Sequence, residues 1–241
     1  MNLTAVSSAA RGLCSNFSDA ASSWQLTLHW DDDTHLKPHH RDEWVSGSGI
    51  APSIADLALE SISGSADVLG FLNPKKLGKS YGYATMPVVR ARKHYERPIK
   101  GGWLAYGHDP LADGQLAPVT YKPDEARVSV EGKAIKYERP LGSSPKPYFP
   151  PLDAGSYERI AARAGLTAEP YVSSWQAWQW LLAQSAVELS LDEGEKKAAA
   201  ACSHGWLTIG LAGIWNGCPR PKGENGEAFG SHALIAELQW L

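Results

Sequence analysis

The sequence has 241 residues, of which 43% are apolar and 20% are charged, an ordinary balance for a folded protein. This composition excludes a chain that is disordered throughout. The formal net charge of −3 excludes a uniformly basic nucleic-acid-binding chain, so any such function must depend on local clusters of Lys and Arg.

Membrane and disulfide proteins are also disfavoured by the sequence. No apolar run approaches the roughly 18 residues that cross a bilayer, and the N-terminus lacks a basic segment followed by an apolar run. The cysteines Cys14, Cys202 and Cys218 are odd in number and have no C-x-x-C spacing, which favours buried or idle thiols over a disulfide framework or a zinc cage. We therefore expect a cytoplasmic protein with no membrane partner.

The first part of the chain predicts a flexible arm and then a strand. Residues 1–23 are rich in Ser and Ala, and the alternation from Trp24 to Trp30 is typical of a half-buried strand. His35, His39 and His40 follow, and such a cluster could in principle hold a metal. Because Pro38 interrupts a helical frame and no cysteine is near, the sequence favours a solvated loop and no metal site.

Residues 41–62 predict two short helices, the second with Pro52 at its first position. A basic segment follows, opposed by Glu96 alone and interleaved with tyrosines. A phosphate backbone favours such a surface, and a solvated charge run explains it almost as well. The cations of this segment are Lys75, Lys76, Lys79, Arg90, Arg92, Lys93, Arg97 and Lys100.

Short strands separated by turn residues are predicted from Trp103 to Tyr137. Within them, Glu131-Gly132 is typical of a tight hairpin turn between Val128 and Ala134. Residues 143–151 contain four prolines, which predicts an irregular connector.

The second half predicts alternating helices and strands. Ser156 is expected to cap one helix and Ser173 or Ser174 the next, and Ser231 is expected to begin a last helix. Between them, residues 186–191 and 206–211 predict two strands joined by a helix over 195–204. A strand, crossover helix and strand imply parallel pairing.

The turn Asp192-Glu193-Gly194 lies at the carboxyl end of the first of these strands, where parallel sheets gather functional groups. With Lys196 and Lys197 in the next helical turn, Glu193 could meet a metal–phosphate group. The spacing by itself favours an exposed turn acid beside two solvated lysines.

Three ordered blocks resemble a known family. Residues 192–198 (D-E-G-E-K-K-A) and 203–215 look like the T-E-G-x-K-K-A signature and the strand that follows it in a Toprim-like domain. Residues 121–127 and 132–140 are similar to that family's F-K-P-D-x-P-R and G-K-x-I-K-Y-E-x-P blocks, and residues 178–181 match its short aromatic helix. The resemblance covers residues 40–241. Such domains lie near the N-termini of cyanobacterial plasmid and phage replication proteins, which typically continue into helicase regions.

The resemblance implies a catalytic role for Glu193, as a general acid or base beside Mg²⁺ held by a later D-x-D pair in the complete parent domain. No D-x-D follows Glu193, and Asp192 and Ala126 replace a Thr and a Pro of the family pattern. We therefore expect no cofactor and no activity in this chain alone. The residues expected to contact nucleic acid or phosphate are Gly194, Lys196, Lys197, Lys122, Arg127, Lys133, Lys136, Arg90, Arg92 and Lys93.

The sequence thus predicts an α+β protein with a flexible arm over 1–23, a β-rich module with a basic face over 24–151, and an incomplete Toprim-like parallel α/β sheet over 152–241. The expected function is that of an N-terminal nucleic-acid-binding, primase-associated module of a replication protein. Its expected partners are single-stranded or duplex DNA and a helicase region in the same or another chain. The alternatives are a non-catalytic DNA-binding or docking module, in which Glu193 is a remnant, and a truncated product without activity.

Overall fold

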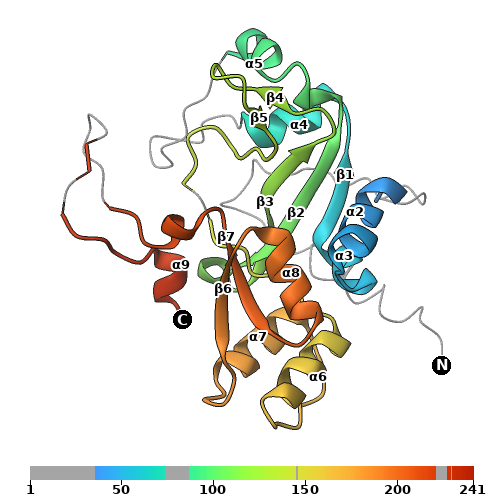
Figure 1. Cartoon of the computed structure of the whole chain (residues 1–241), viewed down its shortest axis with the longest axis vertical. Coiled ribbons are helices and arrows are strands. Elements are labelled where there is room, and N and C mark those ends of the chain that lie inside the picture. Colours follow the sequence, from blue (N-terminus) through green and yellow to red (C-terminus); the bar gives the residue numbers. More distant parts are fainter. Residues whose placement is uncertain (1–35, 74–86, 145, 221–226, 229) are drawn as a thin grey trace, which may run out of the picture.

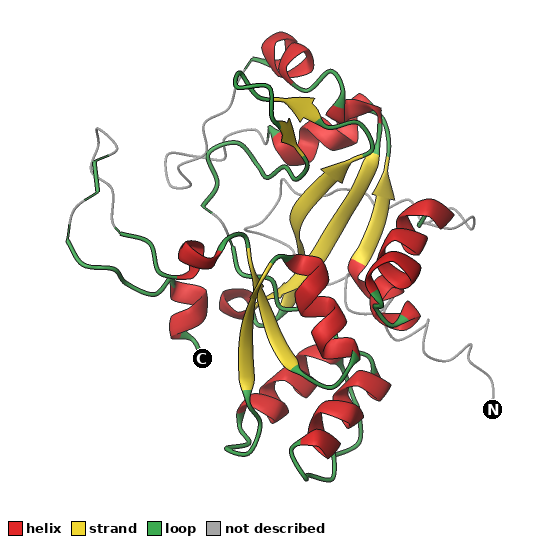
Figure 2. Ribbon diagram, viewed as in Figure 1, coloured by secondary structure: helices red, strands yellow, loops and turns green. Residues whose placement is uncertain are grey.

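The computed structural model describes residues 36–73, 87–144, 146–220, 227–228 and 230–241 (Figure 1). The predicted arm, the predicted strand at 24–30, His35 and three of the lysines of the basic segment, Lys75, Lys76 and Lys79, lie outside the described residues. No helix within the described ranges is long and apolar enough to span a bilayer. The architecture is α+β, as predicted, with an antiparallel sheet, a two-stranded hairpin and a parallel pair of strands (Figure 2).

The antiparallel sheet has the order β1-β2-β3 and is formed by β1 (Leu59–Ile62), β2 (Gly102–Asp109) and β3 (Gln115–Pro123). The two predicted helices before it are α2 (Pro38–Ser48) and α3 (Pro52–Ala58), and α3 packs against β2. The prediction that the second helix extends beyond residue 58 was wrong. Residues Leu59 to Ile62 form β1 instead, because they pair with β2 and bury both ends of the strand.

A smaller assembly caps one end of this sheet. It contains α4 (Ser65–Leu72), α5 (Val88–His94), the 3-10 turn η1 (Pro98–Lys100) and the hairpin of β4 (Arg127–Val128) and β5 (Ala134–Ile135), which gather at the top of Figure 1. The predicted hairpin is confirmed. Its Gly132 has φ +80°, a left-handed conformation that glycine adopts without strain. Phe71, Tyr95 and Tyr121 belong to a separate small core beneath these elements.

The second half contains α6 (Ala154–Arg163), α7 (Ser174–Leu182), β6 (Leu189–Glu193), α8 (Glu195–Ser203) and β7 (Leu207–Leu211). Strands β6 and β7 pair in parallel, from Leu189 opposite Leu207 to Glu193 opposite Leu211, with α8 as the crossover. The predicted parallel unit is therefore confirmed. Strand β6 begins three residues later than predicted.

Helix starts in this half differ in part from the sequence pattern. Helix α6 begins before Ser156, because the Asp153 side chain accepts the hydrogen bond from the Ser156 backbone N–H at 2.7 Å. Ser173 caps α7, as one of the two predicted candidates. The last helix, α9 (Ala236–Gln239), begins five residues after Ser231; the remaining 3-10 turns are η2 (Pro110–Ala112) and η3 (Ile214–Gly217).

One buried cluster contains residues from both sides of the predicted boundary at 151/152. It includes Trp44 and Trp103, which meet edge to face at 5.4 Å, and Phe149 and Trp178, which do so at 5.3 Å. The division into modules at this boundary stays a prediction.

Helix α2 also docks on α8 through polar contacts. The Ser203 hydroxyl accepts the backbone N–H of Ala51 at 2.9 Å, and His204 Nε2 lies 3.0 Å from the Gly49 carbonyl oxygen. The first described helix is thereby fixed against a helix about 150 residues later in the chain.

Candidate functional site

The carboxyl ends of β6 and β7 place Glu193 at an exposed turn. Gly194 has φ +96°, which lets the chain turn from the strand into α8, and its N–H donates to the Leu211 carbonyl at 2.7 Å. The Asp192 carboxylate accepts the backbone N–H of Glu193 at 2.7 Å. Glu193 thus lies at the strand end, as predicted, with its side chain in solvent.

The first turn of α8 already contains a carboxylate of its own. Glu195 is almost fully buried and forms a 2.8 Å ion pair with Arg139. Lys197 is largely exposed and lies 3.8 Å from Asp192. Because Glu195 places negative charge beside the free N–H groups of the helix, it lowers the attraction of this terminus for a second anion.

Two of the predicted phosphate-binding lysines meet on one acid that sequence reasoning missed. Glu43, on α2, accepts hydrogen bonds from Lys122 Nζ at 2.6 Å, Lys196 Nζ at 2.8 Å and Trp103 Nε1 at 3.1 Å. Burial by itself would raise the pKa of Glu43, but these three donors lower it to about 2. Lys122 and Lys196 are therefore brought together, as partners of a carboxylate that is ionised at neutral pH.

The predicted cations other than Lys122 and the two lysines of α8 belong to α5 and to the β4–β5 hairpin and the residues next to it, which form one end of the molecule (Figure 1). Arg127 joins the two elements, because it pairs with the buried Glu138 at 2.5 Å and its guanidinium lies 5.7 Å from the centre of the Tyr95 ring at the end of α5. We call this surface the basic end. Its predicted contact residues are Arg90, Arg92, Lys93, Arg127, Lys133 and Lys136.

The cations of the basic end differ in how far they are neutralised. Arg127 is paired with Glu138, and Lys133 lies 3.4 Å from the exposed Glu131. Within the described part of the chain, no ion pair involves the three exposed cations of α5, Arg90, Arg92 and Lys93. These three side chains, together with the exposed Lys136, for which the described residues likewise show no ion pair, are therefore the most available positive charges among the predicted contact residues.

The prediction that the histidines lie in a solvated loop was wrong for His39 and His40, which belong to helix α2. Pro38 occupies the first position of α2, where its missing N–H costs nothing, so it begins the helix instead of interrupting it. His39 and His40 lie on that helix, and His40 is buried. Its Nδ1 lies 2.7 Å from Ser61 Oγ, and its Nε2 lies 2.7 Å from Asp124 Oδ1.

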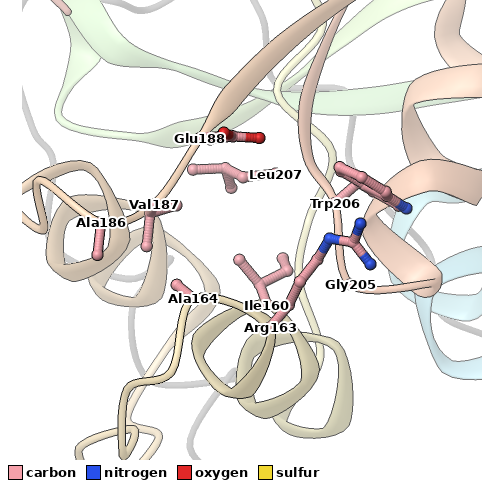
Figure 3. A pocket seen from close by; sticks show the side chains of 9 residues that line it. All are labelled: Ile160, Arg163, Ala164, Ala186, Val187, Glu188, Gly205, Trp206 and Leu207. Carbon is pink, nitrogen blue, oxygen red and sulfur yellow. The ribbon is translucent and has the colours of Figure 1, made fainter.

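A cavity of about 480 Å³ lies at the opposite, amino ends of β6 and β7 (Figure 3). Arg163 stands over the Trp206 ring at 3.1 Å from its centre, and Ile160 and Glu188 also line the cavity. Because Glu193 lies at the carboxyl end of β6, this cavity is separate from the Glu193 turn. Functional groups of parallel sheets usually gather at the carboxyl ends of the strands.

Comparison with known proteins gives partial similarities. Residues 177–241 match a domain of unknown function, DUF3854. The whole chain is 30% identical to an uncharacterized protein of the cyanobacterium Picosynechococcus sp., and it spans 23% of the length of that protein. No solved structure shows a significant match.

We expect that this chain does not bind Mg²⁺ through Glu193. A hard divalent ion needs several oxygen ligands in near-octahedral order, and Glu193 is one exposed carboxylate beside Asp192, whose oxygen accepts a backbone N–H. Isothermal titration with Mg²⁺ should give the same weak isotherm for the wild type and for Glu193→Gln. Tight uptake that disappears in Glu193→Gln would show that the strand end is a complete metal site.

Proposed function

We propose that this chain is the nucleic-acid-binding, primase-associated module of a plasmid or phage DNA replication protein. The observation that supports it most is the basic end, where cations from α5 and from the β4–β5 hairpin gather at one place. The chemistry of such a surface fits a phosphate backbone, which is bound by arrays of Lys and Arg with no need for a closed pocket.

Charge availability decides which part of the surface would bind. Lys122 and Lys196 share the Glu43 carboxylate, and Arg127 is neutralised by Glu138. Arg90, Arg92 and Lys93 have exposed side chains within about one turn of a short helix. We propose that these three contact phosphates, with Lys133 and Lys136 extending the path, and that Arg127 holds the hairpin in place.

The finer proposal is that residues 152–241 belong to the Toprim-like class. It is supported by the parallel β6–α8–β7 unit, with an acid and a glycine at the carboxyl end of β6. In that class, Mg²⁺-dependent phosphotransfer needs a metal-bearing acidic pair besides the glutamate. We propose that the acidic pair and a helicase region are supplied by the same protein or by another chain; this chain spans 23% of the length of its cyanobacterial relative.

The proposal predicts salt-dependent DNA binding that depends on α5. Fluorescence anisotropy of labelled single-stranded and duplex DNA should show log K falling with log salt by about 0.7 to 0.9 for each phosphate contact. Replacing Arg90, Arg92 and Lys93 together by Ala removes about three contacts, so the slope should become shallower by roughly 2 to 3. The same substitutions should weaken binding at low salt by at least tenfold.

The matched control removes three positive charges from other parts of the surface. The triple variant Arg41→Ala, Lys146→Ala, Arg220→Ala changes the net charge equally, so binding through overall charge alone would fall by the same amount in both variants. We expect the control variant to bind nearly as the wild type does. Equal losses in the two variants, or no binding at low salt, would contradict the proposal.

A second candidate, a docking module for another protein, is favoured by exposed apolar side chains at the same end. Val89 on α5 and Val130 in the hairpin turn are largely exposed. Absence of DNA binding in both the wild type and the control would favour this alternative.

A further inference from the structure

Two imidazoles and a carboxylate meet where the start of α2 lies beside the residue that follows β3. The ligand atoms of His39, His40 and Asp124 all lie within 4.8 Å of one another. We propose that these three side chains form a binding site for a divalent transition-metal ion, with Zn²⁺ as the ion that fits the donor set best.

The fold holds the His40 ring through its Nδ1 and leaves its Nε2 facing Asp124. Its Nδ1 lies 2.7 Å from Ser61 Oγ, and this hydroxyl also accepts the backbone N–H of Lys37 at 2.7 Å. The ring is buried, so it cannot turn freely. A metal-binding histidine commonly has its second nitrogen held in this way, which fixes the ring orientation and directs the other nitrogen to the metal.

Asp124 is placed with similar precision. Its backbone N–H donates to the Gly101 carbonyl at 2.9 Å, which fixes the residue directly after β3. Its Oδ1 then lies 2.7 Å from His40 Nε2 and 3.7 Å from His39 Nε2. The carboxylate therefore stands between the two imidazoles, although the sequence separates it from them by more than 80 positions.

The distances between these ligand atoms are close to those between neighbouring ligands of one metal ion. With Zn–N and Zn–O bonds of about 2.0 to 2.2 Å, neighbouring ligand atoms of a tetrahedral site are about 3.3 Å apart. The His40–Asp124 contact of 2.7 Å would have to open and the His39–Asp124 contact of 3.7 Å to close, each by about half an ångström. Rotation of the exposed His39 and Asp124 side chains can supply both changes.

The donor set also indicates the class of ion and the open part of its coordination sphere. Imidazole ligands suit Zn²⁺ and its transition-metal neighbours, whereas Mg²⁺ and Ca²⁺ prefer oxygen alone. The side chain of His39 is 63% exposed and that of Asp124 is 38% exposed, so the ion can enter from solvent. Three protein ligands leave a fourth position for water or another ligand, as in sites that are not purely structural.

Metal titration of the full chain tests the proposal. After treatment with a chelator, isothermal titration with Zn²⁺ should show one ion bound per chain, and the visible spectrum of the Co²⁺ form should report four-coordination. His39→Ala and Asp124→Asn should each weaken Zn²⁺ binding by at least tenfold. Because His39 is largely exposed, His39→Ala should fold as the wild type does, which circular dichroism can verify.

The matched control is His94→Ala, which removes an exposed imidazole that does not belong to the cluster. It should leave stoichiometry and affinity unchanged. Absence of Zn²⁺ binding by the wild type would overturn the proposal and leave the Ser61–His40–Asp124 hydrogen bonds as a structural network. Binding that His39→Ala does not weaken, or that His94→Ala weakens equally, would overturn it as well.

Discussion

Replacing Glu43 by Gln is expected to lower the free energy of unfolding at pH 7 by about 2 to 3 kcal/mol. Glu43 is mostly shielded from solvent and holds Lys122 and Lys196 from two separate elements. A fall in its pKa from 4.5 to about 2 corresponds to roughly 3 kcal/mol of preference for the ionised folded state, at 1.36 kcal/mol per pKa unit. The neutral amide keeps part of the hydrogen bonding and loses the charge.

The effect should depend on pH in a defined direction. The pKa of Glu43 is lower in the folded state than in the unfolded state, so its stabilisation is complete above about pH 4.5 and is lost as the pH falls towards 2. Urea denaturation at several pH values should show the wild type and Glu43→Gln converging in acid. Glu158→Gln, at an exposed position, should change stability by less than about 0.5 kcal/mol. A Glu43→Gln effect that is equal at all pH values would show that packing, not charge, gives Glu43 its role.

Replacing Trp178 by Ala is expected to destabilise the chain by about 3 to 5 kcal/mol. The ring is fully buried, meets Phe149 edge to face, and its Nε1 donates to the Pro150 carbonyl at 2.7 Å. The substitution leaves a cavity where α7 packs on the proline-rich connector. It also leaves the Pro150 oxygen without this donor.

The conservative variant Trp178→Phe separates the contribution of the buried ring from that of the hydrogen bond to the Pro150 carbonyl. It keeps an aromatic ring in the site and removes the indole N–H, so we expect a loss of about 1 to 3 kcal/mol. Equilibrium denaturation of both variants measures the difference. If Trp178→Ala costs less than about 1 kcal/mol, the connector and α7 are not held together by this side chain.

The elements that were predicted correctly depend on local information. The β6–α8–β7 unit follows from two short apolar runs, a glycine turn and an intervening helix, all within about 25 residues. The β4–β5 hairpin follows from a glycine between two short strands. In both cases the residues that determine the structure are close together in the sequence.

Strand β1 was missed because its conformation depends on a distant partner. Residues 59–62 follow a helix without a break, and only their pairing with residues 102–105 makes them extended. The same reason applies to His40, whose proline-containing segment predicted a loop. The two side chains that its ring nitrogens contact, Ser61 and Asp124, are 21 and 84 residues away.

The sequence identified the cations of the candidate site, but it did not indicate which acids they pair with in the folded chain. The sequence places Glu193 at a strand end and identifies the basic segment, both by local pattern. It gave no sign that Glu43 would hold Lys122 and Lys196, because these residues are 79 and 153 positions away from it. Such pairing decides which lysines are available to a phosphate, and only the folded structure determines it.

The docking of α2 on α8 also has a consequence during synthesis. Helix α2 leaves the ribosome about 150 residues before Ser203 and His204, which hold the turn after it. The nascent chain can pair β1, β2 and β3 and bury Trp44 against Trp103 in that interval, since these partners are made first. The surface around Gly49 and Ala51 that later meets α8 stays uncovered until Ser203 and His204 have been made. During that interval this surface is open to chaperones and proteases.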